Sequence, residues 1–381
     1  MVLPEPAPEA RAHSERVVAR IREEIDTHQG WIAFSRYMEL ALYAPQLGYY
    51  SAGARKLGRD GDFVTAPEIS PLFGEALARQ AADVLAQGFD AILEVGAGSG
   101  ALAASMLAEL EHLERLPAQY LILELSADLR ERSRDTLARR VPHLLDRVAW
   151  LNQLPPSFAG FVIGNEVLDA MPVEVIRATR TGVEQAGVTA GADGFAWSWR
   201  AAPAELAAEA MRLGLEAGYT TEIGLVARAF VRTLGAVLER GVALFVDYGF
   251  PEREYYHAQR ASGTLLCHYR HHAHDDPFFL PGLQDITAHV DFSAIARAAR
   301  EAGLELLGYA TQASVLVNCG ITELMLRTPP EDAARYLPQA AAAQKLLSPA
   351  EMGELFKAIA LGRGIAVPLS GFSSGDRSGA L

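Results

Sequence analysis

The sequence is poor in cysteine, in basic residues and in long apolar runs, and each shortage excludes a class of protein. Its 381 residues contain only two cysteines, Cys267 and Cys319, too few for a disulfide framework or a structural zinc cluster. Lys and Arg number 34 against 47 Asp and Glu, and the net charge of −13 argues against nucleic acid as a partner. The uncharged run at residues 306–322 is interrupted by polar residues and glycine, so it predicts a core strand and a turn instead of a membrane span.

The N-terminus also lacks the features of a targeting segment. It has no apolar stretch of the signal-peptide kind, and Glu5, Glu9 and Glu15 argue against a transit peptide. We therefore expect a cytoplasmic protein without a membrane span. Half of the residues are hydrophobic, enough for a sizeable core, and the acidity suits a cationic partner or substrate. No feature of the sequence indicates an oligomeric state.

From residue 89 onwards, short apolar segments alternate with amphipathic ones. This alternation predicts a Rossmann-like α/β fold, in which helices cover both faces of a parallel sheet. One of the predicted helices starts directly after the fourth strand, over residues 167–172. The predicted strands are residues 91–95, 120–125, 148–151, 158–166, 242–249, 304–312 and 354–362.

The remaining segments predict additions to this core. Residues 1–88 contain helical spacing interrupted at Gly30 and are expected to form an N-terminal helical segment. Within the core at 89–364, period-two alternation predicts a β-hairpin insertion at about 173–200, and Ala-rich sequence predicts a helical insertion at about 323–350. The Ser/Gly-rich residues 365–381 are expected to be a mobile tail.

A glycine turn follows the first core strand, in the phrase ILEVGAGSGAL. Gly96, Gly98 and Gly100 leave room for the backbone to approach a ligand, and the helix that follows offers unpaired N–H groups. Two cofactor classes use this geometry. The pattern G-x-G-x-x-A would hold a dinucleotide, whereas E-x-G-x-G-x-G is typical of S-adenosylmethionine-dependent methyltransferases.

Two acidic residues bear on this choice. Glu94 would lie unfavourably near a pyrophosphate, but it suits the ammonium and sulfonium of S-adenosylmethionine, where each charge pair at 4 Å contributes about 4 kcal/mol before desolvation. Glu124 ends the second strand, where a carboxylate can bind both ribose hydroxyls of either cofactor. The pair favours a methyltransferase and leaves the dehydrogenase open.

The end of the fourth strand carries the residues best suited to an acceptor. Asn165 and Glu166 lie where ligands bind in open α/β sheets, and a spacing of three on a helix would place Asp169 on the same face as Glu166. Asp169 could instead cap that helix. Two adjacent carboxylates suit a guanidinium, because they can pair with its N–H donors and localise its charge, leaving one nitrogen free to attack a methyl carbon.

Several phrases together resemble the MidA-type methyltransferases, a family that includes a mitochondrial complex I assembly factor acting on an arginine. The resemblance extends from about Tyr43 to Gly364. It is carried by residues 48–75 (GYYSAGARKLGRDGDFVTAPEISPLFGE), 92–100 (ILEVGAGSG), 164–173 (GNEVLDAMPV), 245–250 (FVDYGF) and 263–292 (GTLLCHYRHHAHDDPFFLPGLQDITAHVDF).

This resemblance implies a class I methyltransferase fold with a seven-stranded sheet, S-adenosyl-L-methionine as cofactor and a protein arginine as acceptor. A quinone-side complex I subunit is the candidate target, although nothing in the chain names it. By motif, Glu94 and the three glycines would line the methionine end of the cofactor and Glu124 its ribose. Asn165, Glu166 and Asp169 would border the acceptor. Thr65 and Glu68 would cap the cofactor from an N-terminal lid. Alternatively, they would only begin a helix, with Ser70 and Pro71 marking a helix boundary.

Other polar residues have two interpretations each. The histidines at 268, 271, 272 and 274 fit a solvated or substrate-facing loop better than a metal site, so we expect no metal. Asp285, Thr287, His289 and Asp291 alternate on one face and could line an acceptor channel, or Asp291 could cap a helix. Asp247 and Tyr248 end the fifth strand, where they could contact the acceptor, support the residues that do, or be ordinary polar residues at a strand end. Two other functions stay open: a nucleotide-dependent oxidoreductase, and a catalytically silent assembly chaperone on the same fold.

Overall fold

A computed structural model of the chain describes residues 3–52 and 65–381. Residues 53–64 of the sequence phrase 48–75 therefore lie outside the described residues. The described chain folds into two compact units. Unit 1 contains the described residues up to 52 together with Asp169–Arg228 and Phe250–Asp291, and unit 2 contains residues 65–168, Ala229–Gly249 and Phe292–Leu381. None of the described helices has both the length and the apolar character that a membrane span requires.

Unit 2 contains the predicted central sheet. Its strand order is β15-β16-β10-β5-β2-β3-β4. The two-residue strand β14 (Val290–Asp291) lies at the end of the last segment of unit 1. The strands are β2 (Ala91–Val95), β3 (Gln119–Leu123), β4 (Val148–Leu151), β5 (Phe158–Asn165), β10 (Leu238–Phe250), β15 (Glu305–Thr311) and β16 (Phe356–Arg363). Neighbours from β4 to β10 are parallel, whereas β16 runs antiparallel to both β10 and β15. The predicted strands and the mostly parallel sheet are therefore confirmed.

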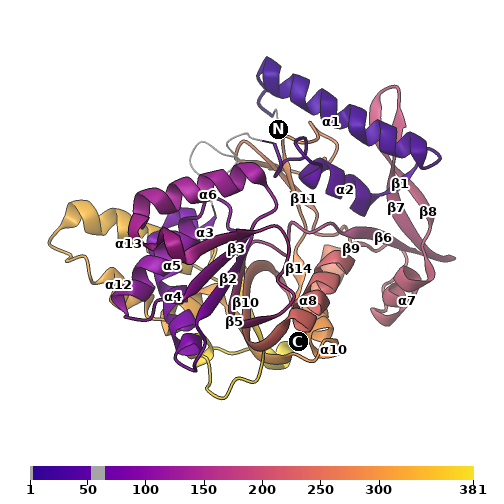
Figure 1. Cartoon of the computed structure of the whole chain (residues 1–381). Coiled ribbons are helices and arrows are strands. Elements are labelled where there is room, and N and C mark those ends of the chain that lie inside the picture. Colours follow the sequence, from indigo (N-terminus) through magenta and orange to yellow (C-terminus); the bar gives the residue numbers. More distant parts are fainter. Residues whose placement is uncertain (1–2, 53–64) are drawn as a thin grey trace. The chain divides into compact units, whose positions relative to one another are not determined.

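Helices pack beside this sheet and share its buried apolar cluster. Figure 1 shows β3, β2, β5 and β10 side by side, with α4 and α5 next to them. The helices are α3 (Ala66–Ile69), α4 (Pro71–Leu85), α5 (Ala101–His112), α6 (Ala127–Arg140), α10 (Phe292–Glu301), α11 (Gln312–Asn318), α12 (Ile321–Met325) and α13 (Ala333–Leu347), with short 3₁₀ helices η1 (Pro142–Arg147), η3 (Ser370–Phe372) and η4 (Ser378–Ala380). Helix α8 (Leu225–Val237) begins in unit 1 and ends in unit 2.

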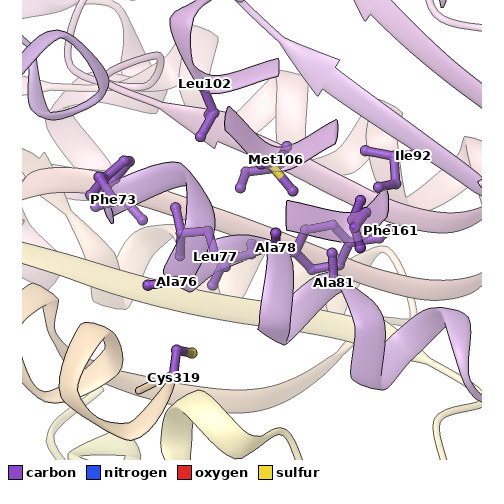
Figure 2. Packing of buried hydrophobic residues seen from close by; sticks show 14 of the residues in the cluster. Phe73, Ala76, Leu77, Ala78, Ala81, Ile92, Leu102, Met106, Phe161 and Cys319 are labelled. Atoms are coloured by element: carbon purple, nitrogen blue, oxygen red, sulfur yellow. The ribbon is translucent and has the colours of Figure 1, made fainter. Parts of the chain in front are cut away.

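The core of unit 2 includes a helix that the sequence pattern assigned to the N-terminal segment. Phe73 and Leu77 of α4 are fully buried in the same cluster as Met106 of α5 and Phe161 of β5. Figure 2 shows these side chains together with Ile92 of β2. Burying a side chain of this size contributes about 1.5–3 kcal/mol, so α4 belongs energetically to the sheet unit.

Unit 1 contains the N-terminal helices and the predicted β insertion. Strand β7 pairs antiparallel with β6 and β8, as a hairpin insertion requires, and β1 and β9 extend this sheet. The elements are α1 (Pro8–Thr27), β1 (Ile32–Ala33), α2 (Phe34–Tyr43), β6 (Glu174–Thr179), β7 (Gly182–Gly191), β8 (Gly194–Ala201), α7 (Ala204–Arg212), β9 (Thr220–Ile223), α9 (Glu252–Tyr255), η2 (Ala258–Arg260), β11 (Leu266–Tyr269), β12 (His272–His274) and β13 (Asp285–Thr287). Strands β12, β11 and β13 form a separate small sheet.

The C-terminal segment differs from the expected mobile tail. Phe372 is buried in the unit 2 core, and the Gly371 backbone N–H donates to Gln80 Oε1 of α4 at 2.8 Å. Further along, Asp376 Oδ1 accepts the Tyr309 N–H of β15 at 3.0 Å. The Ser/Gly composition therefore reflects tight turns that pack against the core, where small residues allow close approach.

Candidate functional site

The glycine turn after β2 has a backbone that only glycine adopts without strain. Gly96, Gly98 and Gly100 have φ angles of 68°, 53° and 79°. At Gly100, the residue before α5, an added Cβ would lie 2.8 Å from Ser133 Cα, so this glycine permits the close packing of α5 and α6. Gly96 is solvent-exposed and therefore presents bare backbone at the end of β2. The predicted strand, glycine turn and helix are confirmed.

The structure brings Glu124 to this turn. Its Oε2 accepts the Gly98 N–H at 3.3 Å, and its Oε1 accepts the Ser126 N–H at 2.9 Å. Burial raises the pKa of this carboxyl, and the two backbone donors oppose that rise. Each carboxylate oxygen can accept a second hydrogen bond, so Glu124 has acceptor capacity left for a diol such as ribose. The next residue, Leu125, is 71 % exposed and offers an apolar surface beside the carboxylate.

Glu94 lies inside the core instead of on an open surface. Its side chain is 1 % exposed and accepts a hydrogen bond from the Tyr120 hydroxyl at 2.6 Å. Burial raises the pKa of this carboxyl to about 7, and the charge of Glu124 adds to the rise. Near neutral pH, Glu94 therefore exchanges between its neutral and charged forms, and its predicted pairing with a cationic cofactor depends on that equilibrium.

The segment TAPE reaches the glycine turn through one side chain. Glu68 of α3 accepts a hydrogen bond from the Ser99 hydroxyl, which lies between Gly98 and Gly100. Thr65 precedes α3 and makes no capping hydrogen bond with its side chain. Ser70 caps α4 by accepting the Leu72 N–H at 3.2 Å. The interpretation of Ser70 and Pro71 as a helix boundary is therefore also correct. Sequence reasoning missed Ser99, although its place between two motif glycines was the available signal.

The end of β5 departs from the sequence prediction. No helix forms over residues 167–172, where the chain makes bends and turns before β6, so the argument that Glu166 and Asp169 share a helix face is wrong. Glu166 has a φ of 53°, a left-handed conformation that a right-handed helix cannot contain. Pro172 also disfavours helical geometry at Met171, the residue before it.

Asn165 and Glu166 remain directly joined at this edge. Asn165 Nδ2 donates to Glu166 Oε1 at 3.1 Å, which orients the carboxylate. Asn165 Oδ1 is buried and accepts no hydrogen bond from the residues that the structure describes. Because buried polar atoms are nearly always paired, this oxygen indicates a ligand that brings its own donor, such as an ammonium.

Asp169 lies in unit 1 among aromatic and acidic residues. Its backbone oxygen accepts the Ala288 N–H at 3.1 Å, and the Tyr43 hydroxyl donates to the oxygen of Ala170 at 2.9 Å. The Tyr50 hydroxyl donates to Asp285 Oδ1 at 2.9 Å. Burial raises the pKa of Tyr50, and the nearby charges of Asp285 and Asp169 add to the rise. Of the sequence candidates, Asp169 and Asp285 thus share one neighbourhood within unit 1, and Tyr50 is a member that sequence reasoning missed.

The remaining candidates have separate surroundings. Asp291 Oδ2 accepts the Tyr256 hydroxyl at 3.2 Å, the His289 ring packs edge-on to Phe250, and Thr287 donates to the oxygen of Leu266. The four histidines at 268, 271, 272 and 274 lie in or beside the β11–β12 hairpin. Within residues 3–52 and 65–381, no group of three or more His, Cys, Asp or Glu side chains could hold a metal ion. Both cysteines are free and buried.

The geometry of unit 2 fits a nucleoside cofactor with a cationic part. Exposed Gly96 permits close approach of a ligand, Glu124 has acceptor capacity for hydroxyls, and Asn165 Oδ1 is a buried acceptor to which no described residue donates. Gly96 and Glu124 directly follow β2 and β3, and Asn165 ends β5; these three neighbouring strands have their carboxyl ends at one edge of the sheet. That edge is where open α/β sheets bind ligands.

Comparison with known proteins identifies the cofactor. Residues 76–310 match the model of a family of S-adenosyl-L-methionine-dependent methyltransferases, Methyltransf_28. The chain is also similar to a protein from Burkholderia thailandensis whose crystal structure contains S-adenosyl-homocysteine, at 53 % identity over the whole of both chains and a TM-score of 0.97. The strand order and the similarity together establish the class I methyltransferase fold, and S-adenosyl-L-methionine is the cofactor.

More distant relatives carry an arginine methyltransferase name. The protein arginine methyltransferase NDUFAF7, mitochondrial, of Danio rerio is 28 % identical over 364 residues, which cover 86 % of this chain and 82 % of that protein. The Drosophila melanogaster homologue is 27 % identical and covers 97 % of this chain and 92 % of its own. These comparisons decide between the two cofactor classes that the glycine turn left open. The chain belongs to the MidA-like family of S-adenosyl-L-methionine-dependent methyltransferases.

Proposed function

We propose that this methyltransferase modifies an arginine guanidinium of a protein, with a quinone-side subunit of complex I as the candidate target. Two lines support the proposal. Relatives at 27–28 % identity are named protein arginine methyltransferases. The residues at the end of β5 are also of the type that a guanidinium requires, because a carboxylate can accept several of its N–H donors at once. We also propose that the protein acts in the cytoplasm, as its N-terminal composition predicts.

The observation that carries this proposal is the conformation of Glu166. This residue directly follows β5, which pairs with β2, and it has a left-handed φ of 53° and a carboxylate oriented by Asn165. A non-glycine residue in that region costs about 1–3 kcal/mol, and such strain is concentrated at functional sites. A carboxylate held in this way suits the recognition of a cation better than the stabilisation of the fold.

The chemistry divides between the cofactor and the chain. S-adenosyl-L-methionine, when bound, supplies an electrophilic methyl group. The glycine turn and Glu124 would hold its nucleoside, and Asn165 Oδ1 would accept a donor of its amino-acid part. Glu166 would accept guanidinium N–H donors, localise the positive charge on those nitrogens and leave another nitrogen free to attack.

Asp169 stays a candidate for acceptor binding because it lies only three residues after Glu166 in the sequence. Three residues of chain span at most about 11 Å between Cα atoms, whatever the local conformation. One arginine side chain with a bound carboxylate covers a comparable distance. Asp169 is therefore a second candidate partner for the substrate cation, with no requirement for a shared helix.

Substitution of Glu166 tests the function directly. We expect Glu166→Gln to reduce methylation at least about tenfold, because a neutral amide cannot localise the guanidinium charge. Binding of S-adenosyl-homocysteine, measured by calorimetry, should stay within about threefold of wild type. The reaction is followed by mass spectrometry of the quinone-side complex I subunit from cells that lack the protein or express wild type or the variant.

A surface variant, Glu131→Gln on α6, provides the control and should leave both measurements unchanged. Full methylation by Glu166→Gln would disprove the role of Glu166. An unmethylated subunit in wild-type cells would disprove the proposed target and leave the methyltransferase family assignment intact.

A further inference from the structure

The backbone on both sides of the Glu166 Cα atom is fixed to strand β10. Strands β5 and β10 are parallel neighbours, and their register ends with Asn165 opposite Val246. Beyond that point the Glu166 N–H donates to the Val246 oxygen at 2.9 Å. The next N–H, that of Val167, donates instead to the side chain of Asp247, with 3.1 Å between the nitrogen and Oδ1. A carboxylate thus replaces the backbone acceptor where the strand pairing stops.

These two hydrogen bonds explain how Glu166 keeps a strained conformation. A left-handed non-glycine residue persists only when its surroundings determine the adjoining peptide groups. The Glu166 and Val167 amides are the peptide groups on either side of the Glu166 Cα atom, and both are held by β10. Asp247 is fully buried, so water does not compete for its oxygen and the bond to Val167 is a strong restraint.

The same turn packs against the cofactor-binding glycine. A Cβ atom built on Gly96 would lie 3.2 Å from Val167 Cγ2, and one built on Gly164 would lie 3.3 Å from the same methyl group. Val167 is therefore seated between the end of β5 and the turn after β2. Its amide, held by Asp247, sets the position of Glu166 relative to Gly96.

We propose that Asp247 is a positioning residue for methyl transfer, acting through the Val167 amide to hold Glu166 at the acceptor edge of the cofactor site. The inference rests on the proposed role of Glu166, and it assigns to Asp247 a function that is exerted through a backbone amide. The required property of Asp247 is an acceptor oxygen at this position. Its negative charge is a separate property. The charge concerns Lys357 of β16, which lies opposite Asp247 in the register, and both side chains are buried.

Two substitutions separate the acceptor oxygen from the charge. Asp247→Asn keeps an oxygen that can accept the Val167 N–H, whereas Asp247→Ala removes it. Both remove the buried charge, so both should lower the unfolding temperature. We expect methyl transfer to fall at least about tenfold in Asp247→Ala and to stay within about threefold of wild type in Asp247→Asn. A purely structural role would lower both activities in step with stability.

The activity measurement needs no knowledge of the acceptor. The probe is tritiated S-adenosyl-L-methionine added to protein extract from cells that lack the enzyme, and the readout is the rate of label transfer to protein. The calorimetric dissociation constant for S-adenosyl-homocysteine should change less than about threefold in every variant, because the Gly96 N–H is held independently by the Leu123 oxygen at 2.9 Å. The matched control is Asp83→Ala, which removes another carboxylate that accepts a backbone N–H, that of Ser370, and should affect stability alone.

A double variant tests whether Asp247 acts through Glu166. If it does, Asp247→Ala combined with Glu166→Gln should transfer label no more slowly than Glu166→Gln alone. Hydrogen exchange should show faster exchange of the Val167 amide in Asp247→Ala and not in Asp247→Asn.

Additive losses of activity, equal activity in the alanine and asparagine variants, or unchanged Val167 exchange would each overturn the proposal. Acid hydrolysis of the labelled protein shows which amino acid carries the label. It therefore distinguishes a failure of the proposed role of Asp247 from a failure of the proposed arginine methylation. Label outside arginine would disprove the arginine acceptor. The coupling between Asp247 and Glu166 could still be measured in that case, from the rates of label transfer in the single and double variants.

Discussion

Two glutamates beside the glycine turn illustrate how burial alone changes a carboxylate. Burial raises the pKa of both Glu94 and Glu124, but Glu124 accepts two backbone N–H groups that favour its charged form. Glu94 accepts a hydrogen bond from the Tyr120 hydroxyl, and its pKa of about 7 is well above the ordinary value of 4.5. The two residues are therefore expected to differ in how they affect stability as pH changes.

The Glu94 pKa predicts a stability penalty that grows with pH. An acid whose pKa is raised on folding binds its proton more tightly in the folded protein, so stability falls as pH rises from 4.5 to about 7. The full penalty above that range is about 3 kcal/mol, from 1.36 kcal/mol per unit. We expect the difference in unfolding free energy between Glu94→Gln and wild type to increase by about 2–3 kcal/mol in favour of the variant between pH 5 and pH 8.

Urea unfolding without cofactor, followed by tryptophan fluorescence at both pH values, measures this difference. Glu131→Gln is the control, because its side chain is exposed and the substitution should show no such trend. A constant difference between Glu94→Gln and wild type at pH 5 and pH 8 would mean that Glu94 is already ionised throughout.

At the scale of elements, the junction between the glycine turn and the two helices that follow depends on one missing side chain. Gly100 and Gly88 both have left-handed backbones, with φ angles of 79° and 91°. A Cβ at Gly100 would lie 2.8 Å from Ser133 Cα, whereas a Cβ at Gly88 would have no neighbour within 4 Å. Substitutions at the two glycines therefore separate the cost of backbone strain, which both share, from the cost of steric overlap, which arises at Gly100.

Alanine at each position should give different losses of stability. Gly88→Ala introduces backbone strain alone and should cost about 1 kcal/mol. Gly100→Ala adds an overlap with backbone atoms of α6, which should bring the total loss to about 2–4 kcal/mol and weaken S-adenosyl-homocysteine binding. Thermal unfolding and calorimetry measure both effects. Equal losses in the two variants would show that α6 moves away at little cost.

The sequence predicted the sheet well because its strands satisfy local and global requirements together. Each strand is apolar, ends at a turn signal and lies buried between helices. The hydrophobic pattern and the residue composition of each segment therefore both predict a buried strand. The residues at the strand ends, Glu94, Glu124 and Glu166, were also found in this way, because a polar residue after an apolar strand is visible in the sequence.

The loop after β5 and the C-terminal segment were predicted incorrectly for a shared reason. Local propensity favoured a helix at 167–172 and a mobile tail at 365–381. Tertiary contacts decided otherwise: Asp247 holds Val167 from a strand 80 residues away in sequence, and Phe372 enters the unit 2 core. Neither partner is detectable within the local window. Backbone strain at Glu166 is likewise invisible in the sequence, since glutamate seldom adopts a positive φ.

At the scale of the whole molecule, the division of the chain into units differs from the sequence-based boundary at residue 88. Residues 3–52 pack in unit 1, where Ile21 and Phe34 share an apolar cluster with Val188 of the β insertion. Helix α4 instead contributes Phe73 to the core of unit 2. Because the chain passes between the units several times, the N-terminal helices have partners far along the sequence.

Two truncations distinguish the boundaries. A chain that starts at residue 65 keeps α4 and the complete unit 2 core, so it should bind S-adenosyl-homocysteine within about tenfold of the full chain while exposing apolar surface of unit 1. A chain that starts at residue 89 also loses α4, whose buried side chains each contribute about 1.5–3 kcal/mol, and should neither fold cooperatively nor bind.

Calorimetry with S-adenosyl-homocysteine and fluorescence of a hydrophobic dye measure the two properties. The dye should bind the chain from 65 more strongly than the full chain, because Val175, Val188 and Ile286 lose the helices that cover them. Undiminished cofactor binding by the chain from 89 would show that α4 is dispensable and that residues 1–88 form one separable segment. The contrast between the truncations thus assigns α4 to the catalytic fold or to the N-terminal segment by a direct measurement.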